Sequence, residues 1–258
     1  MSALTEPALV TREATSPARI AVSWSLARAE LPRLVRHPTF LLSLAIAALT
    51  IVTTGTEPGD PVIDQLTWSL FILPTPLAVA FALLGSRSTR NETREIEDAT
   101  GGGQAVVQSS ATMLVLVPAA TVVAVGILGG AFAEVLGANK ASMFSGGVAG
   151  ESMLVLAQSA VMAAAVCAFA LAAGSWLPHW ITAMLILFVI WQGADTSFHP
   201  VAWDSSEPIP ALAWHLAYGS GVALLASTAA LLKHRRDAVT ALVGVTGLAL
   251  AIAGGILQ

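Results

Sequence analysis

Apolar runs that approach or reach about 20 residues recur along the chain, as at 112–133, 152–173 and 238–257. A hydrocarbon core about 30 Å thick is crossed by roughly 20 helical residues, so each run is long enough to span a membrane. Hydrophobic residues make up 55% of the chain and charged residues 11%, and the mean hydropathy is +0.76, outside the usual range of soluble domains. The sequence therefore predicts an all-α membrane protein.

Polar and turn-forming segments divide the apolar sequence into about six to seven predicted transmembrane helices within one transmembrane domain, residues 38–258. Residues 1–15 are polar and small and are expected to form a flexible N-terminal tail. They lack the apolar core of a cleavable signal peptide. Pro74 and Pro76 predict a distortion inside the second span. The expected spans cover about residues 39–54, 66–85, 112–133, 152–173, 180–193, 211–232 and 238–257.

Residues 16–37 have the pattern of an amphipathic helix that lies along the membrane interface and leads into the first span. One stripe is apolar and includes Trp24, whose indole suits the headgroup region, while the arginines suit an anionic leaflet. A soluble N-terminal helix is the alternative interpretation. The stripe consists of Ile20, Trp24, Ala27, Leu31 and Leu34, and the charged residues elsewhere are Arg19, Glu30, Arg33 and Arg36.

The distribution of cations predicts the orientation, because Lys and Arg near the ends of spans are retained in the cytoplasm. In the seven-span arrangement eleven of the twelve cations share one side, and only Lys140 falls opposite. We therefore expect a multi-pass protein of the cell membrane with a cytoplasmic N-terminus.

The residues inside the predicted spans limit the possible functions. The spans contain no Asp, Glu, Lys or Arg, which argues against a secondary transporter with an ionisable relay. The chain has no G-x-x-x-x-G-K-[ST] motif, so it cannot hold nucleotide phosphates in a P-loop, and its net charge of −4 argues against a nucleic-acid partner. Cys167 is the only cysteine and the five histidines are dispersed, so no metal site is predicted.

Ser220 lies in a Gly-Ser-Gly sequence in the sixth span, which superficially resembles the setting of the nucleophile of an intramembrane serine protease. The only histidine within a span, His215, is five residues earlier on the same helix, which places it about 140° away around the axis. The glycines beside Ser220 are more typical of a close helix-packing site.

Three stretches give the chain a resemblance to the ABC-2 type transporter permeases, especially the actinobacterial ones. ARAELPRLVRHPTFLLSLAIAAL (27–49) resembles the family's interfacial elbow and first span. AWHLAYGSGVALLASTAALLKHRR (213–236) resembles its Trp-His-Leu span with a basic end, and AGSWLPHW (173–180) resembles the turn before its fifth span. The resemblance implies a type V exporter-like fold with an N-terminal elbow helix.

The resemblance also implies that residues 94–110 contain the cytoplasmic coupling helix, which docks on a separate ATPase. The residues assigned to this contact are Arg94, Glu95, Glu97, Asp98, Thr100 and Gln104. Three glycines at 101–103 replace the family's usual pattern, and each weakens a helix by up to about 1 kcal/mol, so a shorter or interrupted coupling helix is expected.

In this interpretation the chain is a transport subunit without catalytic residues or a cofactor of its own. The partners implied are P-loop ATPase subunits that bind ATP and Mg, a second copy or a related permease that completes the pore, and membrane lipid. The expected cargo is an exported amphipathic or hydrophobic compound or a peptide. The alternative is a non-transporting membrane scaffold or immunity subunit that recruits partners.

Overall fold

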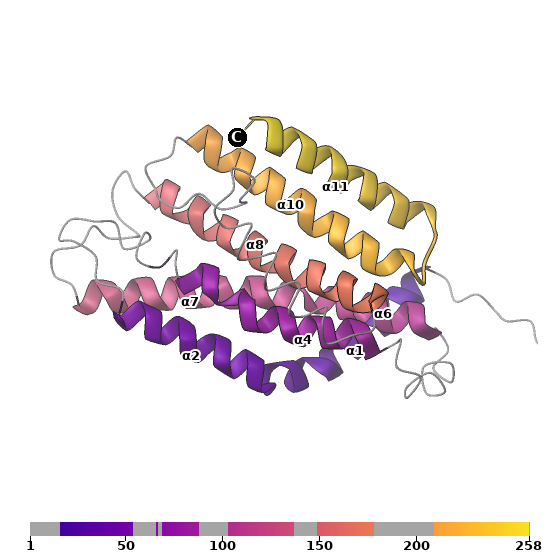
Figure 1. The fold of residues 1–258 in the computed structure, drawn as a ribbon, viewed down its shortest axis with the longest axis horizontal. Helices are drawn as coiled ribbons and strands as arrows, with labels where there is room; N and C mark the ends of the chain where they lie inside the picture. The colour runs from indigo at the N-terminus through magenta and orange to yellow at the C-terminus, as the bar shows by residue number, and fades with distance from the viewer. Residues whose placement is uncertain are drawn as a thin grey trace, which may run out of the picture.

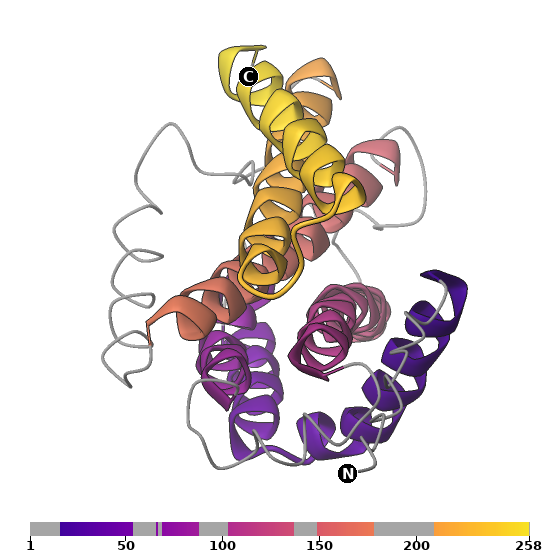
Figure 2. The same ribbon diagram turned by 90° about the vertical axis from the view of Figure 1, so that its right-hand side faces the viewer.

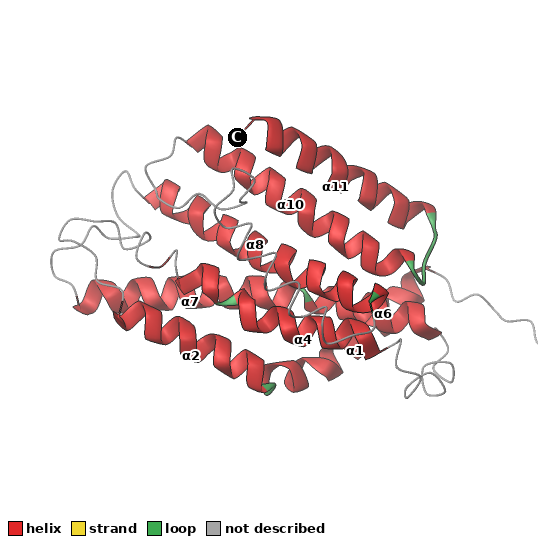
Figure 3. Ribbon diagram, viewed as in Figure 1, coloured by secondary structure: helices red, strands yellow, loops and turns green. Residues whose placement is uncertain are grey.

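The computed structural model describes residues 16–53, 66, 69–87, 103–136, 149–177 and 209–257, and these residues form helices without any strand (Figures 1 and 3). The all-α prediction is confirmed for this part of the chain. The helices are α1 (Ser16–Val35), α2 (Pro38–Thr53), α4 (Pro74–Ser86), α6 (Gly103–Leu114), α7 (Leu116–Leu136), α8 (Ala149–Trp176), α10 (Ile209–Leu232) and α11 (Ala238–Leu257).

Five helical segments of the described chain are long and apolar enough to cross a membrane, and a sixth is added if α1 and α2 form one bent span. The five segments are Ser69–Ser86, Gly103–Phe132, Ser152–Trp176, Ala213–Leu232 and Ala238–Leu257. The predicted tail 1–15 and the predicted span 180–193 lie outside the described residues.

The helices are stacked in the order α11, α10, α8 and then the group of α1, α2, α4, α6 and α7, as both views show (Figures 1 and 2). The α4 and α8 spans occupy the centre, with 67% of each buried, whereas only 17% of the α11 span is buried. The core is built of small and aliphatic side chains around Phe81, Leu77 and Leu171, which are fully buried.

The chain bends by 59° between α1 and α2, at Arg36 and His37, which separate the two helices. Pro32 lies inside α1. Alone, α2 has only 16 residues, fewer than a full crossing requires. Ala27 and Leu34 of α1 are buried, whereas Trp24 remains exposed.

The distortion predicted from Pro74 is present, because the helix is interrupted at Leu73 and α4 begins at Pro74. Proline at the first helical position is compatible with a helix start, since its missing N–H has no partner within the helix there. The proline therefore divides the second span rather than ending it.

The helix that contains the predicted third span begins before the expected bound, Thr112. The helical segment begins at Gly103, and Gln108 and Ser110 are buried in it. The Ser110 hydroxyl donates a hydrogen bond to the carbonyl of Val107 at 2.7 Å, so this hydroxyl is satisfied within the helix and its burial costs little. A short turn at Val115 separates α6 from α7.

α8 continues to Trp176, so the first residues of the stretch 173–180, which the resemblance assigns to a turn, are helical. Gly174 packs directly on α4, and a Cβ atom added to it would collide with the carbonyl oxygen of Ala82. Gly85 of α4 is equally close to the backbone of Leu171 and Ser175. These glycines serve close helix packing rather than a turn.

The last two spans agree with their predicted bounds and form an antiparallel hairpin. Gly221 of α10 lies against Gly247 and Ala251 of α11, and Gly254 lies against Tyr218. The interpretation of the Gly-Ser-Gly sequence as a packing site is therefore confirmed.

Candidate functional site: the cation-rich end of the helix bundle

Lysines and arginines from three separate segments meet at one end of the bundle. Arg87, which follows the last residue of α4, lies beside α1, and Gly85 lies against the end of α8 at Ser175. Lys233, which follows α10, donates a hydrogen bond to the Ser175 carbonyl. The described cations of these three segments, which are α1 with the turn after it, the residue after α4 and the turn after α10, are Arg19, Arg28, Arg33, Arg36, Arg87, Lys233, Arg235 and Arg236.

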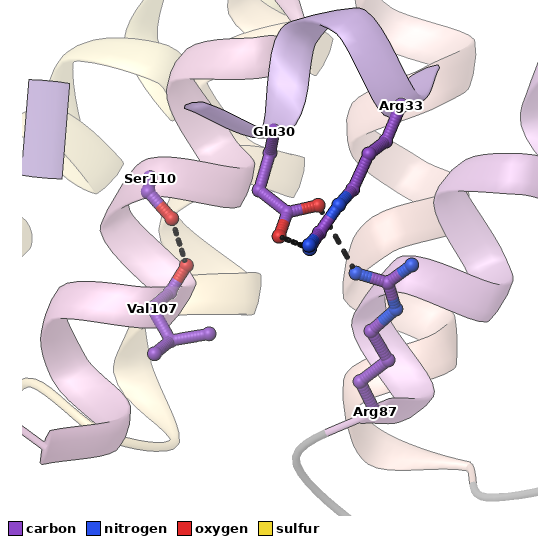
Figure 4. Close-up of polar contacts among 5 residues, drawn as sticks. All are labelled: Glu30, Arg33, Arg87, Val107 and Ser110. Atoms are coloured by element: carbon purple, nitrogen blue, oxygen red, sulfur yellow. Dashed lines mark hydrogen bonds and ion pairs between the residues drawn. The ribbon is translucent and has the colours of Figure 1, made fainter. Parts of the chain in front are cut away.

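Glu30 of α1 links the first helix to α4 (Figure 4). One carboxylate oxygen accepts a hydrogen bond from Arg33 at 2.7 Å, and the other lies 3.3 Å from the Arg87 guanidinium. The Glu30 side chain is only 19% exposed, whereas both arginines are largely exposed. Exposed ion pairs contribute about 0–1 kcal/mol each to stability. This contact therefore orients α1 relative to the end of α4 more than it stabilises the fold.

A small cavity of about 100 Å³ lies beneath this ion cluster, between α1, α4 and α6. Its lining includes His37, whose Nδ1 is 2.7 Å from the Thr39 hydroxyl. The cavity is too small for a drug-sized molecule, for which pockets are typically several hundred Å³. It is therefore part of the joint between α1 and α4.

The predicted coupling segment, residues 94–110, lies only partly within the described residues. Arg87 is the last described residue before it, and its final part, from Gly103, forms the start of α6. Gly103 has φ +56°, in the left-handed region that favours glycine, so a side chain here would strain the start of α6. Of the predicted site residues, Gln104 is half-buried in the first turn of α6, while Arg94, Glu95, Glu97, Asp98 and Thr100 lie outside the described residues.

Protein-family models, curated proteins and solved structures gave no match to this chain. The resemblance to ABC-2 type permeases thus stays a prediction, and the site is interpreted from its own geometry.

The same end also joins α8 to α10. Trp176 donates an indole N–H to the Ala229 carbonyl at 2.8 Å, beside the contact between Lys233 and Ser175. A lysine at a helix C-terminus satisfies a free carbonyl and suits the negative end of the helix dipole. Partial burial lowers the pKa of Lys233. α8 and α10 therefore run in the same direction and are held together where both end.

Asp237 caps α11 at this end. One carboxylate oxygen accepts the backbone N–H of Thr240 at 2.8 Å, and the other pairs with Arg235. These two interactions lower the pKa of Asp237 from 3.8 to about 2. A carboxylate at this position satisfies a free N–H of the first turn and the positive end of the helix dipole.

Replacing Asp237 with alanine is expected to destabilise the chain by about 1 kcal/mol, and replacement with asparagine by much less, because asparagine also caps helices. The folded pKa is below the unfolded one, so the carboxylate's contribution is present above about pH 4 and is lost as the pH falls towards 2. Thermal unfolding in detergent from pH 7 to 2 measures both effects. If the difference in melting temperature between wild type and Asp237→Asn stays constant from pH 7 to 2, the charge of Asp237 does not contribute to stability as proposed.

The interiors of the described spans contain no Asp, Glu, Lys or Arg, as the sequence predicted. Their buried polar side chains are neutral, including Gln108, Gln158 and Ser159. Within the described residues no group of three or more His, Cys, Asp or Glu side chains is placed to hold a metal ion. The charged chemistry described here is therefore confined to the end of the bundle.

Sequence reasoning identified the cations of this end but missed the contacts between them. The pair of Glu30 and Arg33 has the i, i+3 spacing of a helix ion pair and could have been found. Arg87 is 57 residues from Glu30, so no local pattern could predict that contact.

Proposed function

We propose that the chain is the membrane-spanning permease subunit of an ATP-binding cassette transporter of the ABC-2 type, which exports an amphipathic or hydrophobic compound or a peptide. In this proposal it is not an enzyme. A separate P-loop ATPase binds ATP and Mg and supplies the energy, and a second copy or a related permease completes the pore in the cell membrane.

The observation that carries the proposal is that Arg87 and Gly103, the described residues before and after 88–102, both lie on elements packed against α1. Arg87 and Gly103, which flank this segment, belong to helices packed at the end where Glu30 ties α1 to α4. A segment that contacts an ATPase has to be held by the ends of spans, so that a force applied to it moves the helices. The predicted contact residues Glu95, Glu97 and Asp98 fall within this segment.

Two further features support this function. The described spans are free of charged residues, which suits lipophilic cargo better than ions or sugars and leaves no ionisable relay for coupling to a proton gradient. The cations collect at one end, which under the positive-inside rule faces the cytoplasm, where an ATPase would dock. α1 would then lie as an elbow at the cytoplasmic interface.

Purification from native membranes tests the proposal against the alternative of a scaffold or immunity subunit. A transporter is expected to retain a P-loop ATPase whose rate of ATP hydrolysis changes when lipophilic compounds are added. A scaffold is expected to retain partners whose activity does not respond. An ATPase with an unchanged rate across a broad set of such compounds would favour the scaffold.

Export is expected to continue with ATP present after the proton gradient has been collapsed by an uncoupler, because the described spans contain no carboxylate or ammonium that could carry charge. Uptake of fluorescent lipophilic compounds into inside-out vesicles measures this. The control is the same complex with the Walker lysine of the partner ATPase replaced, which should not transport. Loss of export on collapse of the gradient alone would indicate secondary transport.

A further inference from the structure

An apolar groove of about 570 Å³ runs along the outside of the bundle between α1, α2 and the helices α6 and α7. Its wall is apolar along α7 from Leu116 to Leu128, and Phe40 and Leu44 of α2 form part of the opposite side. Thr121 is the hydroxyl residue in the lining, and its side chain is already bonded to the Val117 carbonyl of its own helix at 2.8 Å. The lining of this part of the groove is therefore apolar, as is expected of a site that binds a hydrocarbon chain.

The end of the groove formed by α1 has a different chemistry. Arg28 is the one charged residue among the described residues that line the groove, and Trp24 stands one helical turn before it. Both side chains are exposed, and Arg28 has no ion-pair partner in the described part of the chain, unlike Arg33 and Arg87. A free guanidinium beside an indole is typical of the headgroup level of a membrane.

The length of the groove matches one leaflet. Twelve residues separate Leu116 from Leu128, and a rise of 1.5 Å per residue gives about 18 Å, close to half of a hydrocarbon core about 30 Å thick. The groove therefore extends from the headgroup level at α1 to about the middle of the bilayer.

We propose that the groove binds one anionic phospholipid, with one acyl chain between α2 and α7 and its phosphate against Arg28. The second acyl chain stays in the surrounding bilayer. A second copy of the chain fits this surface less well, because a protein partner would have to bury the Arg28 charge without an acidic side chain from the described part of this groove. The inference requires only that the chain is inserted in a membrane and does not depend on transport.

Native mass spectrometry of the detergent-purified chain, titrated with phosphatidylglycerol or with phosphatidylcholine of identical acyl chains, tests the proposal. One phosphatidylglycerol is expected to bind per chain, and more tightly than phosphatidylcholine. Arg28→Gln is expected to weaken phosphatidylglycerol binding about fivefold, the effect of one cation near an anionic headgroup, and to remove most of the preference over phosphatidylcholine. Arg36→Gln, which removes the same charge directly after α1 and outside the groove, is expected to leave binding unchanged.

A second pair of variants tests the acyl-chain part of the groove. Ala124→Phe fills the groove wall and is expected to reduce the binding of both lipids at least fivefold, whereas Ile127→Phe enlarges an exposed side chain of α7 outside the groove and should not. The measured mass also reports the oligomeric state. Equal lipid binding by wild type, Arg28→Gln and Ala124→Phe would overturn the proposal, as would a lipid-free dimer that Ala124→Phe dissociates.

Discussion

Replacing Gly174 with alanine is expected to destabilise the folded chain by roughly 1–3 kcal/mol, whereas the same replacement at Gly255 should leave its stability unchanged or slightly raise it. At Gly174 the new methyl group would collide with the Ala82 carbonyl, which is backbone and cannot rotate away. At Gly255 it would meet only the Tyr218 ring at 3.6 Å, an ordinary van der Waals distance. Both glycines are helical, so the gain in helix propensity from alanine is the same.

Thermal unfolding of the detergent-solubilised variants, followed by circular dichroism, measures this difference. A larger residue, as in Gly174→Leu, is expected to prevent α4 and α8 from packing and to abolish the folded protein. Equal melting temperatures for Gly174→Ala, Gly255→Ala and wild type would show that the two helices are not in backbone contact.

The triple replacement of Glu95, Glu97 and Asp98 with alanine is expected to weaken assembly with the ATPase about tenfold and to leave membrane insertion intact. Exposed ion pairs contribute about 0.5 kcal/mol each, so three lost contacts correspond to roughly one order of magnitude in affinity. The remaining affinity should also depend less on salt, because fewer charges contribute. Copurification of the ATPase across a salt series measures both effects.

Glu57, Asp60 and Asp64 provide a matched control, because their replacement with alanine removes the same three charges from a loop predicted to lie on the other side of the membrane. This control is expected to retain the ATPase. If both triple variants assemble normally, the acidic residues are not the docking surface and the contact has to lie elsewhere on the cation-rich end. If both lose the ATPase, net charge rather than position is responsible.

The spans were predictable where apolar sequence ends at clear charged boundaries. The basic run at 233–237 separates the last two spans, and the predicted span 238–257 coincides with α11. The interruption at Leu73 was predictable from Pro74, because proline disrupts the hydrogen bonds of the preceding helical turn.

The differences between prediction and structure have a common cause. The polarity or small size of a residue does not indicate which residues from other parts of the chain surround it in the fold. The polar residues at the start of α6 predict a segment outside the span, yet Gln108 and Ser110 are buried. Gly174 predicts a turn because glycine is common in turns. In the structure, a residue without a side chain is needed there because the backbone of Ala82 packs directly against it. The candidate site was predictable only as a collection of cations, since Arg87 reaches Glu30 from a distant part of the chain.

The glycine contacts differ in the sequence distance they bridge, and this difference bears on biogenesis. Gly221 and Gly247 are joined by a short hairpin, so α10 and α11 can pair soon after both are made. Gly85 has to wait for the region around Gly174, about 90 residues later, which at 5–20 residues per second is roughly 5–20 s of synthesis. During this interval the glycine face of α4 has no partner from α8, so α4 is open to mispairing in the nascent chain.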